Sequence, residues 1–448
     1  MNNGVADAKV ETIAAIATAQ GKAAIGIVRL SGPISKKIAE NISNKNLEPK
    51  IAQFCKFKDK KNEVIDEGIC LYFTAPNSLT GEDIVEFQSH GSPQALNLLL
   101  KECVVHGARL ANPGEFTERA FLNGKIDLTQ AEAIADVIDA QSIQSLKSAN
   151  ESLQGRFKSD IENIQKELIN LRVYIEGAMD FAEEEIDFLD NKDLLEKFSS
   201  ILKKLDETIA TTQKSTLLRQ GVKIVIYGEP NVGKSTLLNQ LIGRDVAIVT
   251  EIAGTTRDQL EQQIIIDGVP ALLIDTAGVR ETDDIVEQKG VERAKQIREH
   301  ADIVLNVLDA QKKDNIKKLG GLNQAPIINV FNKIDKVKNL TQNNDDHDVY
   351  ISAKNNLGIE KLIETLGKLI KTKDMLESPN IVRNRQVESL IKSLESVRKA
   401  KMLLEQTKSG EIVAEELSIA QNSLSKITGE YLSDDLLGEI FSRFCIGK

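Results

Sequence analysis

The stretch Gly228–Ser235 constrains the fold of this chain more than any other. It reads GEPNVGKS, follows the apolar run 223–227 and opens the amphipathic run 236–242, so we expect a strand, a loop and a helix. Glycines at this spacing let backbone N–H groups wrap a polyphosphate, and the helix N-terminus adds the positive end of a dipole. Lys234 offers a charge to the outer phosphates, and Ser235 offers its hydroxyl to Mg²⁺. The alternative is a glycine-rich turn, but the flanking elements favour a phosphate loop.

The segment around this loop alternates strands with helical stretches. Buried strands are expected at 303–308, 326–331 and 349–351. This alternation is typical of a mostly parallel sheet with helices on both faces. One hairpin interrupts it, because 263–266 and 271–274 flank Asp267-Gly268. We therefore predict a Ras-like P-loop G domain within a multidomain chain of α+β and α/β class.

Three further motifs follow strands, at the edge where an α/β sheet places its ligand. Asp275-Thr276-Ala277-Gly278 fits the D-x-x-G element that senses the terminal phosphate through Mg²⁺ and the glycine amide. Asn332-Lys333-Ile334-Asp335 supplies a carboxylate that accepts two hydrogen bonds from guanine, whereas adenine has no such donor pair. Ser352-Ala353-Lys354 ends the next strand and would back the same base. Together with the phosphate loop, these motifs predict GTP binding.

The loop 250–258, TEIAGTTRD, adds a mobile element to the predicted site. Thr256 is expected to close on Mg²⁺ when the terminal phosphate is present. An ordinary flexible loop is the alternative interpretation of Gly254-Thr255-Thr256. The residues that we expect at the GTP site are Asn231, Val232, Gly233, Lys234, Ser235, Thr236, Thr250, Glu251, Ile252, Ala253, Gly254, Thr255, Thr256, Asp275, Thr276, Ala277, Gly278, Asn332, Lys333, Asp335, Ser352, Ala353 and Lys354.

The position after Gly278 bears on hydrolysis. A Ras-like enzyme places a water-orienting glutamine there, but this chain has Val279, whose side chain cannot orient water. Another group must do so, and spacing alone does not choose among the nearby carboxylates, which are Glu281, Asp283, Asp284 and Glu287. No arginine finger can be assigned either, because Arg257 and Arg280 are equally compatible with surface positions.

The N-terminal region predicts an α+β domain. Residues 11–122 alternate short apolar runs with helical periods, including strands at 25–30 and 69–73 and a helix at 92–106. The polar, lysine-rich stretch 44–62 is expected to form loops or an edge hairpin whose lysines make a solvated face.

Helical periodicity dominates on either side of the G segment. Apolar residues recur at steps of three and four over 157–175, a second helix is expected from 194 to about 210, and the periodicity returns from 381. Acidic residues cluster between the first two helices, where solvated helix ends are favoured over a cation site: Glu183, Glu184, Glu185, Asp187 and Asp190.

Neither helical region is large enough to be expected to fold stably on its own. We therefore expect one helical domain interrupted by a nucleotide-binding insertion at about 221–372. The predicted domains are an N-terminal α+β domain (1–122), a helical domain in two parts (123–218 and 375–448) and the G domain (219–374).

The net charge and the residue composition of the chain argue against several classes of protein. A net charge of -10 and a pI near 5.3 argue against a nucleic-acid-binding surface that extends over the whole chain. They do not exclude a local basic patch. The cysteines show no C-x-x-C spacing and only 4 histidines are present, so neither a zinc site nor a disulfide framework is expected. No signal pattern or membrane-length apolar run is seen, and we expect a cytoplasmic protein.

With these motifs, the chain resembles the tRNA-modification GTPases of the MnmE, or TrmE, family over nearly its whole length. The GTPase motifs are shared by many proteins. Five other runs are far more specific: 25–33 (IGIVRLSGP), 80–83 (TGED), 113–116 (PGEF), 123–128 (NGKIDL) and 445–448 (CIGK).

The resemblance implies a homodimer built through the N-terminal domains, with a 5-formyl-tetrahydrofolate site near the interface. By position in the matching motifs, the implied folate contacts are Arg29, Glu86, Lys125 and Lys448. From the residues alone, each of these would be interpreted as surface charge. The family also implies a functional role for Cys445, whose chemistry stays open.

The resemblance also accounts for the missing glutamine and arginine. It implies that K⁺, held by Asn231, Thr250, Ile252 and Thr255, stabilises developing charge much as a guanidinium does. Glu287 matches the family's catalytic acid, which orients water when G domains meet across the dimer. Mg²⁺ is expected on Ser235 and Thr256.

The reaction implied by the family is modification of the wobble uridine of certain tRNAs at carbon 5, of the carboxymethylaminomethyl type, with folate as one-carbon donor. A separate FAD-dependent protein, similar to MnmG or GidA, is the implied partner, and this chain has no Rossmann-type flavin fingerprint of its own. The alternative is a GTP-dependent ribosome-assembly switch, which has no reason to carry the folate-like motifs or the Cys445 tail.

Overall fold

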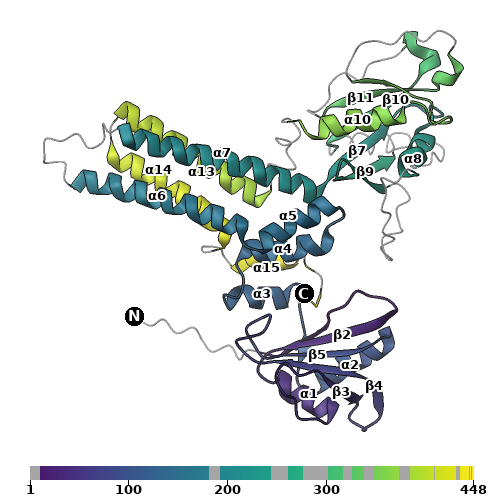
Figure 1. Ribbon diagram of the computed structural model, residues 1–448, viewed down its shortest axis with the longest axis vertical. Helices are drawn as coiled ribbons and strands as arrows, with labels where there is room; N and C mark the ends of the chain where they lie inside the picture. Colours follow the sequence, from purple (N-terminus) through teal and green to yellow (C-terminus); the bar gives the residue numbers. More distant parts are fainter. Residues whose placement is uncertain are drawn as a thin grey trace, which may run out of the picture. The chain divides into compact units, whose positions relative to one another are not determined.

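The computed structural model describes residues 11–180, 192–243, 261–275, 301–315, 325–337, 347–372, 384–407, 409–429, 434–442, 444 and 446–447. Two compact units make up the chain. The N-terminal unit joins Met1–Ala135 with Thr428–Lys448, and the central unit is Asp136–Ile427. Figure 1 shows a sheet with helices in the N-terminal unit, and long helices and a second sheet in the central unit. The predicted α+β and α/β class is confirmed.

The sheet of the N-terminal unit has six strands in the order β3-β4-β5-β2-β1-β6. Their bounds are β1 Ile13–Ile16, β2 Ala23–Ser31, β3 Gln53–Lys58, β4 Val64–Phe73, β5 Ile84–Gly91 and β6 Arg109–Leu110. Only β1 and β6 run parallel. Of the two alternatives predicted for residues 44–62, loops or an edge hairpin, the structure shows the hairpin, since β3 is an edge strand paired with β4. Exposed lysines suit such an edge because they discourage pairing with another chain.

One face of this sheet packs against helices α1 (Ser35–Ser43) and α2 (Pro93–Val105). Side chains alternate along a strand, so Val28, Cys55 and Cys70 enter this core while their neighbours face the opposite way. The described cysteines are free, and burial raises the pKa of the Cys70 thiol.

The end of the chain returns to the N-terminal unit. Helix α15 (Asp434–Ser442) places Phe441 in a cluster with Phe121 of α3 (Glu115–Leu122) and Leu128 of α4 (Leu128–Asp139). The domain boundaries drawn from the sequence assign this segment to the second part of the helical domain, and those boundaries stay a prediction.

The central unit contains a bundle whose helices share one apolar core, and Figure 1 shows its four longest helices lying side by side. Its helices are α6 Arg156–Asp180, α7 Lys192–Gln220, α13 Arg385–Thr407 and α14 Gly410–Thr428, and α5 Ile143–Leu153 lies against α6 and α7. Helix α7 runs past the predicted end near residue 210. The threonine-rich stretch 211–216 has weak helix propensity, but burial of Thr212 and Leu217 overrides it. The acidic cluster of residues 183–190 lies outside the described residues.

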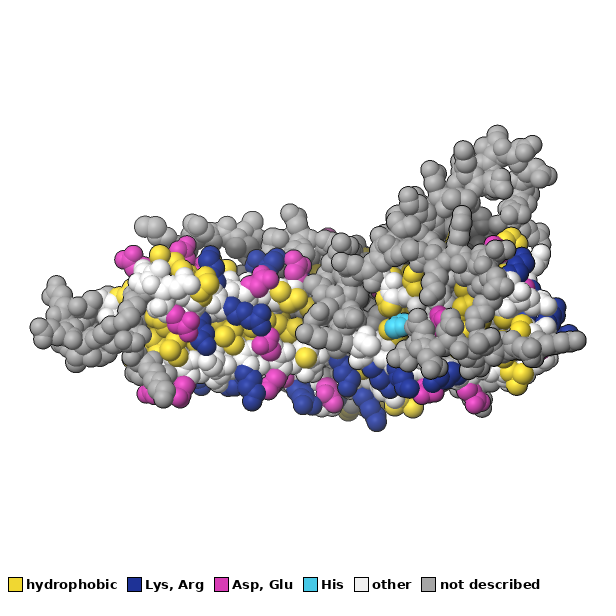
Figure 2. Space-filling view, turned by 90° about the horizontal axis from the view of Figure 1, so that it is seen from above, with side chains coloured by type: hydrophobic (Ala, Val, Ile, Leu, Met, Phe, Trp, Pro, Cys, Tyr) yellow, Lys and Arg dark blue, Asp and Glu magenta, His cyan; other side chains and the backbone are white. Residues whose placement is uncertain are grey.

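The outer surface of this bundle carries charges of both signs. Pairs four residues apart, such as Arg172–Glu176 and Lys203–Glu207, recur along the helices. Figure 2 shows acidic side chains interspersed with basic ones over the described part of one face. Among the described helices, none is long and apolar enough to span a membrane.

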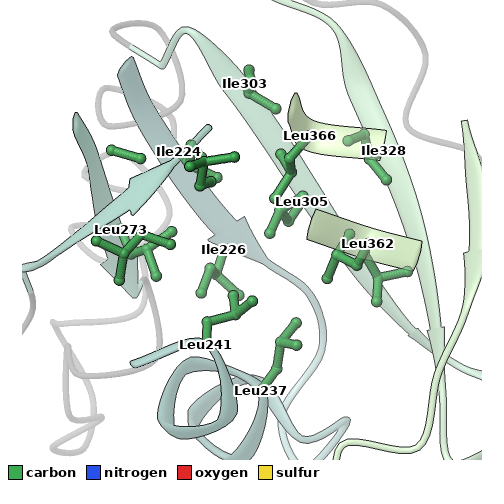
Figure 3. Packing of buried hydrophobic residues seen from close by; sticks show 14 of the residues in the cluster. Ile224, Ile226, Leu237, Leu241, Leu273, Ile303, Leu305, Ile328, Leu362 and Leu366 are labelled. Atoms are coloured by element: carbon green, nitrogen blue, oxygen red, sulfur yellow. The ribbon is translucent and has the colours of Figure 1, made fainter. Parts of the chain in front are cut away.

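The second sheet has the order β12-β11-β10-β7-β9-β8. Its strands are β7 Val222–Tyr227, β8 Glu261–Ile266, β9 Val269–Asp275, β10 Ile303–Asp309, β11 Ile327–Asn332 and β12 Asp348–Tyr350. All pairs are parallel except β8 with β9, which form the predicted hairpin. Figure 3 shows Leu237 and Leu241 of α8 (Lys234–Ile242), and Leu362 and Leu366 of α10 (Ile359–Ile370), packed against the strands.

Candidate functional site

The phosphate loop joins the carboxyl end of β7, a central strand, to α8. Its backbone turns through the left-handed region at Asn231 (φ 61°) and Gly233 (φ 99°). A side chain at Gly228 would place its Cβ 2.3 Å from the carbonyl oxygen of Val307, and one at Gly233 would meet Asn332 at 2.4 Å. The two glycines are therefore required by space as well as by backbone angle.

Lys234 lies inside this loop. Its Nζ donates hydrogen bonds to the carbonyl oxygens of Gly228 at 2.7 Å and Glu229 at 2.9 Å. Burial lowers the pKa of Lys234, and the charge of Asp275 opposes that change. The ammonium is thus desolvated and aimed at the space that the loop encloses, where phosphate oxygens can exchange for the carbonyls.

Ser235 and Asp275 bring the first two motifs together. The Ser235 hydroxyl donates to Oδ2 of Asp275 at 3.3 Å, and Asp275 is buried at the end of β9. A hydroxyl and a carboxylate are the oxygen ligands that Mg²⁺ prefers, so this donor pair fits the predicted ion. The described residues contain no cluster of three or more His, Cys, Asp or Glu suited to a metal, and Thr256, the other predicted ligand, lies outside them.

Asn332 ties the base motifs to the phosphate loop. Its Nδ2 donates to the Val232 carbonyl at 2.8 Å, and its Oδ1 accepts from the Ala353 amide at 3.0 Å. The side chain is buried, at 3% exposure, so these bonds are shielded from water. Three sequence motifs, separated by up to 121 residues (232 to 353), are thus held by one amide.

Asp335 is positioned by the last motif. Its Oδ1 accepts a 2.5 Å hydrogen bond from the Ser352 hydroxyl, and both carboxylate oxygens keep lone pairs that can accept from a ligand. The backbone of Lys333 adopts the left-handed conformation (φ 66°), and its Nζ donates to Oδ2 of Asp309 at 2.7 Å. Lys354, the last predicted residue of this motif, is exposed.

Sequence reasoning missed Asp309. Partial burial alone would raise its pKa, but the hydrogen bond from Lys333 and the Gln311 amide lower it. The available signal was its place directly after the strand 303–308, at the same sheet edge as the other motifs.

We expect Asp309→Ala to raise the dissociation constant for GTP about fivefold, because Lys333 loses the partner that holds it beside the base motif. Equilibrium titration with a fluorescent GTP analogue measures the change. The matched control is Gln311→Ala, since Gln311 contacts Asp309 only through a backbone amide that alanine keeps. Equal affinities for both variants would contradict this role.

A second group of predicted residues lies in the N-terminal unit. Arg29 of β2 and Glu86 of β5 are direct cross-strand partners, and the Arg29 Nε donates to Glu86 Oε1 at 2.8 Å. Their side chains are 20% and 15% exposed. Arg29 also lies 5.7 Å from the centre of the Phe116 ring. Lys125 donates to the Pro76 carbonyl at 2.9 Å.

The C-terminal peptide packs beside the same sheet. Ile446 forms a β-bridge with Pro113, and a Cβ on Gly447 would lie 2.2 Å from the Ile16 carbonyl. Ile16 is paired with Val28, the neighbour of Arg29. Cys445 and Lys448 themselves lie outside the described residues, as do Thr250, Glu251, Ile252, Ala253, Gly254, Thr255, Thr256, Thr276, Ala277, Gly278 and Glu287.

Comparison with known proteins identifies the family. Residues 12–125 match the family described as GTP-binding protein TrmE N-terminus, and residues 128–445 match the MnmE helical domain. The tRNA modification GTPase MnmE of Legionella pneumophila (strain Paris) is 48% identical over 446 residues, which cover 98% of this chain and 100% of the relative. The MnmE of Nitrosomonas eutropha is 47% identical, covering 98% and 99%.

The chain belongs to the MnmE family of tRNA modification GTPases.

MnmE membership confirms the resemblance drawn from the sequence motifs, and with it the prediction of a GTP-hydrolysing enzyme of tRNA modification. The two matched regions together leave only residues 1–11, 126–127 and 446–448 outside.

Proposed function

We propose that this protein is a K⁺-dependent GTPase that works with an FAD-dependent partner to modify the wobble uridine of certain tRNAs at carbon 5, using a folate one-carbon unit. One observation carries the GTPase part of the proposal. The Asn332 side-chain amide bonds to the phosphate loop at Val232 and to the base motif at Ala353. The segments expected to bind the phosphates and the base of one nucleotide are therefore connected directly.

The chain's own residues suggest how that frame acts on GTP. Lys234 neutralises outer phosphate charge from within a buried loop, and Ser235 and Asp275 supply oxygen ligands for Mg²⁺. When bound, Mg²⁺ would neutralise charge on the phosphate oxygens. We propose Glu287 as the residue that orients water, with K⁺ on Asn231, Thr250, Ile252 and Thr255.

The folate part of the proposal is supported by the donor set in the N-terminal unit. Arg29 and Lys125 are cations suited to the carboxylates of a folate, and Glu86 is an acceptor suited to its amino and ring N–H groups. Arg29 and Glu86 are mostly shielded from water, which strengthens hydrogen bonds to a ligand. Lys448 completes the proposed set, and Cys445 is proposed to have a functional role whose chemistry stays open.

We propose that the homodimer forms through the face of the N-terminal sheet opposite α1 and α2, where Phe116 of α3 covers β1 but apolar side chains of other strands stay exposed. Cross-strand neighbours Phe54 and Ile69 lie on this face and are 58% and 37% exposed. Ile25 on β2 is 61% exposed. An apolar sheet face open to water is unfavourable, and a second copy covering it would bury these side chains beside Arg29 and Glu86.

Ile69→Asp should therefore convert the dimer to a monomer of 49.3 kDa. Burying a carboxylate in an apolar interface costs several kcal/mol, so we expect the dimer dissociation constant to rise at least about 100-fold. Light scattering after gel filtration measures the mass. The matched control is Leu98→Asp on α2, an exposed leucine on the helix-covered side of the same unit. A dimer that survives Ile69→Asp but not Leu98→Asp would place the interface elsewhere.

Nucleoside analysis of tRNA tests the proposed function as a whole. A strain lacking the protein should carry wobble uridine without the carbon-5 group, and the intact gene should restore it. A variant gene encoding Lys234→Ala should fail to restore it, because the phosphate loop then lacks its charge. Unchanged tRNA together with defective ribosomal subunits would instead favour the ribosome-assembly alternative.

A further inference from the structure

A network of charges in the N-terminal unit centres on Arg119 of α3. Its guanidinium donates to Oε2 of Glu82 at 3.0 Å and to Oε1 of Glu115 at 2.8 Å. A third hydrogen bond, of 2.9 Å, goes to the carbonyl of Glu11. The Arg119 side chain is only 11% exposed, so solvent screens these bonds little.

Glu82 connects this arginine to two parts of the predicted folate site. It belongs to the 74–83 loop, and its Oε2 also accepts a 2.6 Å hydrogen bond from the Ser31 hydroxyl. Ser31 ends β2 two residues after Arg29. One carboxylate therefore links α3, the strand that carries Arg29 and the 74–83 loop.

The same loop holds Lys125. Its Pro76 carbonyl accepts the Lys125 ammonium at 2.9 Å, and the side chain of Lys125 packs within 3.3 Å of where a Cβ on Gly81 would lie. The neighbouring Asn123 donates to the Thr80 carbonyl at 2.7 Å. The position of the Lys125 ammonium thus depends on the conformation of the 74–83 loop.

A second branch of the network leads away from the loop. Arg109 of β6 donates to both oxygens of Glu115, at 2.6 and 2.7 Å, and to Glu11. Burial alone would raise the pKa of Glu115, but hydrogen bonds from Arg109, the Asn112 amide and Arg119 lower it to about 2. This branch ties α3 to the sheet edge.

We propose that Arg119 is a positioning residue for the folate site: through Glu82 it fixes the 74–83 loop, and so places Lys125 relative to Arg29. This inference rests on the proposed folate function. Arg119 need not touch the ligand. Its role is to keep two cations on separate elements at the spacing that one bound folate requires.

A purely structural role for the network predicts a different pattern. In that case, breaking either branch lowers stability and affects the folate site to the same extent. If Arg119 acts through Glu82, only the branch that reaches the loop controls folate affinity. The two arginines therefore provide a matched pair of variants, Arg119→Gln and Arg109→Gln.

The test is calorimetric titration of full-length protein with 5-formyl-tetrahydrofolate, alongside thermal unfolding of each variant. Arg119→Gln should weaken binding about tenfold, because a hydrogen bond to a charged group is worth at least about that factor in an equilibrium constant. Arg109→Gln should lower the melting temperature similarly and leave affinity within about twofold of wild type. If Arg119→Gln does not fold, Glu82→Gln replaces it, because it removes the charge and keeps the side-chain shape.

Rescue by a conservative change adds a second readout. Arg119→Lys keeps the charge and one donor direction, so affinity should lie between wild type and Arg119→Gln. Lys125→Ala reports on the folate site itself. If the wild-type protein binds no folate, the proposed folate function is overturned, and this inference with it. If Lys125→Ala loses binding while Arg119→Gln, or Glu82→Gln in its place, binds as tightly as wild type, only the present inference is overturned.

Discussion

The variant Asp335→Asn is expected to hydrolyse xanthosine triphosphate in preference to GTP. A carboxylate accepts from both the N1–H and the exocyclic amine of guanine, whereas an amide offers one acceptor and one donor. Xanthine has a carbonyl in place of the exocyclic amine, so the amide matches it and mismatches guanine. The Ser352 hydroxyl, 2.5 Å from Asp335 Oδ1, holds this side chain in place for the base.

We expect the ratio of kcat/KM for the two nucleotides to change by about 10⁴-fold, because a site built to pair with polar groups rejects a mismatched partner strongly. Steady-state phosphate release with each nucleotide measures it. Asp348→Asn is the control: it makes the same chemical change in the same sheet, on β12, where Asp348 accepts from Asn329. Unaltered guanine preference in Asp335→Asn would show that another residue reads the base.

Local patterns were sufficient to predict most of the central sheet. The hairpin 263–274 was predictable because Asp267-Gly268 supplies the two left-handed residues of a tight turn, and the observed φ angles are 50° and 86°. The length of α7 was not predictable from its sequence. Its last turns are stabilised by burial of residues such as Leu217 in the core of the second sheet, a tertiary contact that propensity does not contain.

The predicted GTP site and the predicted folate site differ in how far the sequence alone indicates their chemistry. The phosphate loop is contiguous, so its chemistry follows from spacing, whereas Arg29 and Glu86 are 57 residues apart and meet only through strand pairing. Asp309 was missed for a related reason. Its predicted role depends on Lys333, which follows β11 and so lies beside the end of β10. A single aspartate after a strand carries no motif. Resemblance to the family supplied the charged residues of the predicted folate site, and strand pairing brings two of them, Arg29 and Glu86, into contact.

Replacement of K⁺ by Na⁺ should lower GTP turnover by about 100-fold, comparable to the loss of one preorganised electrostatic contact to a transition state. No arginine finger can be assigned to this chain, so a fixed cation is the proposed source of charge stabilisation, whereas Glu287 is proposed to orient water in place of the glutamine that Val279 replaces. Asn231 is the predicted K⁺ ligand that the structure describes. Its exposed side chain lies in the phosphate loop, on a backbone that is left-handed at φ 61°.

Asn231→Gly should abolish the difference between K⁺ and Na⁺ while changing GTP affinity less than about threefold. Glycine is the informative substitution because it adopts positive φ without strain, so the loop that wraps the phosphates keeps its shape and only the side-chain oxygen is lost. Glu229→Ala, in the same loop, is the control, since the Glu229 side chain makes an exposed 3.7 Å ion pair with Lys312, and alanine keeps the backbone carbonyl that Lys234 contacts. Turnover that still responds to K⁺ in Asn231→Gly would mean that other ligands suffice to hold the ion. Loss of GTP binding would instead show that the Asn231 side chain supports the phosphate loop itself. If Asn231 acts through the ion, the variant loses the response to K⁺ but keeps its affinity for GTP.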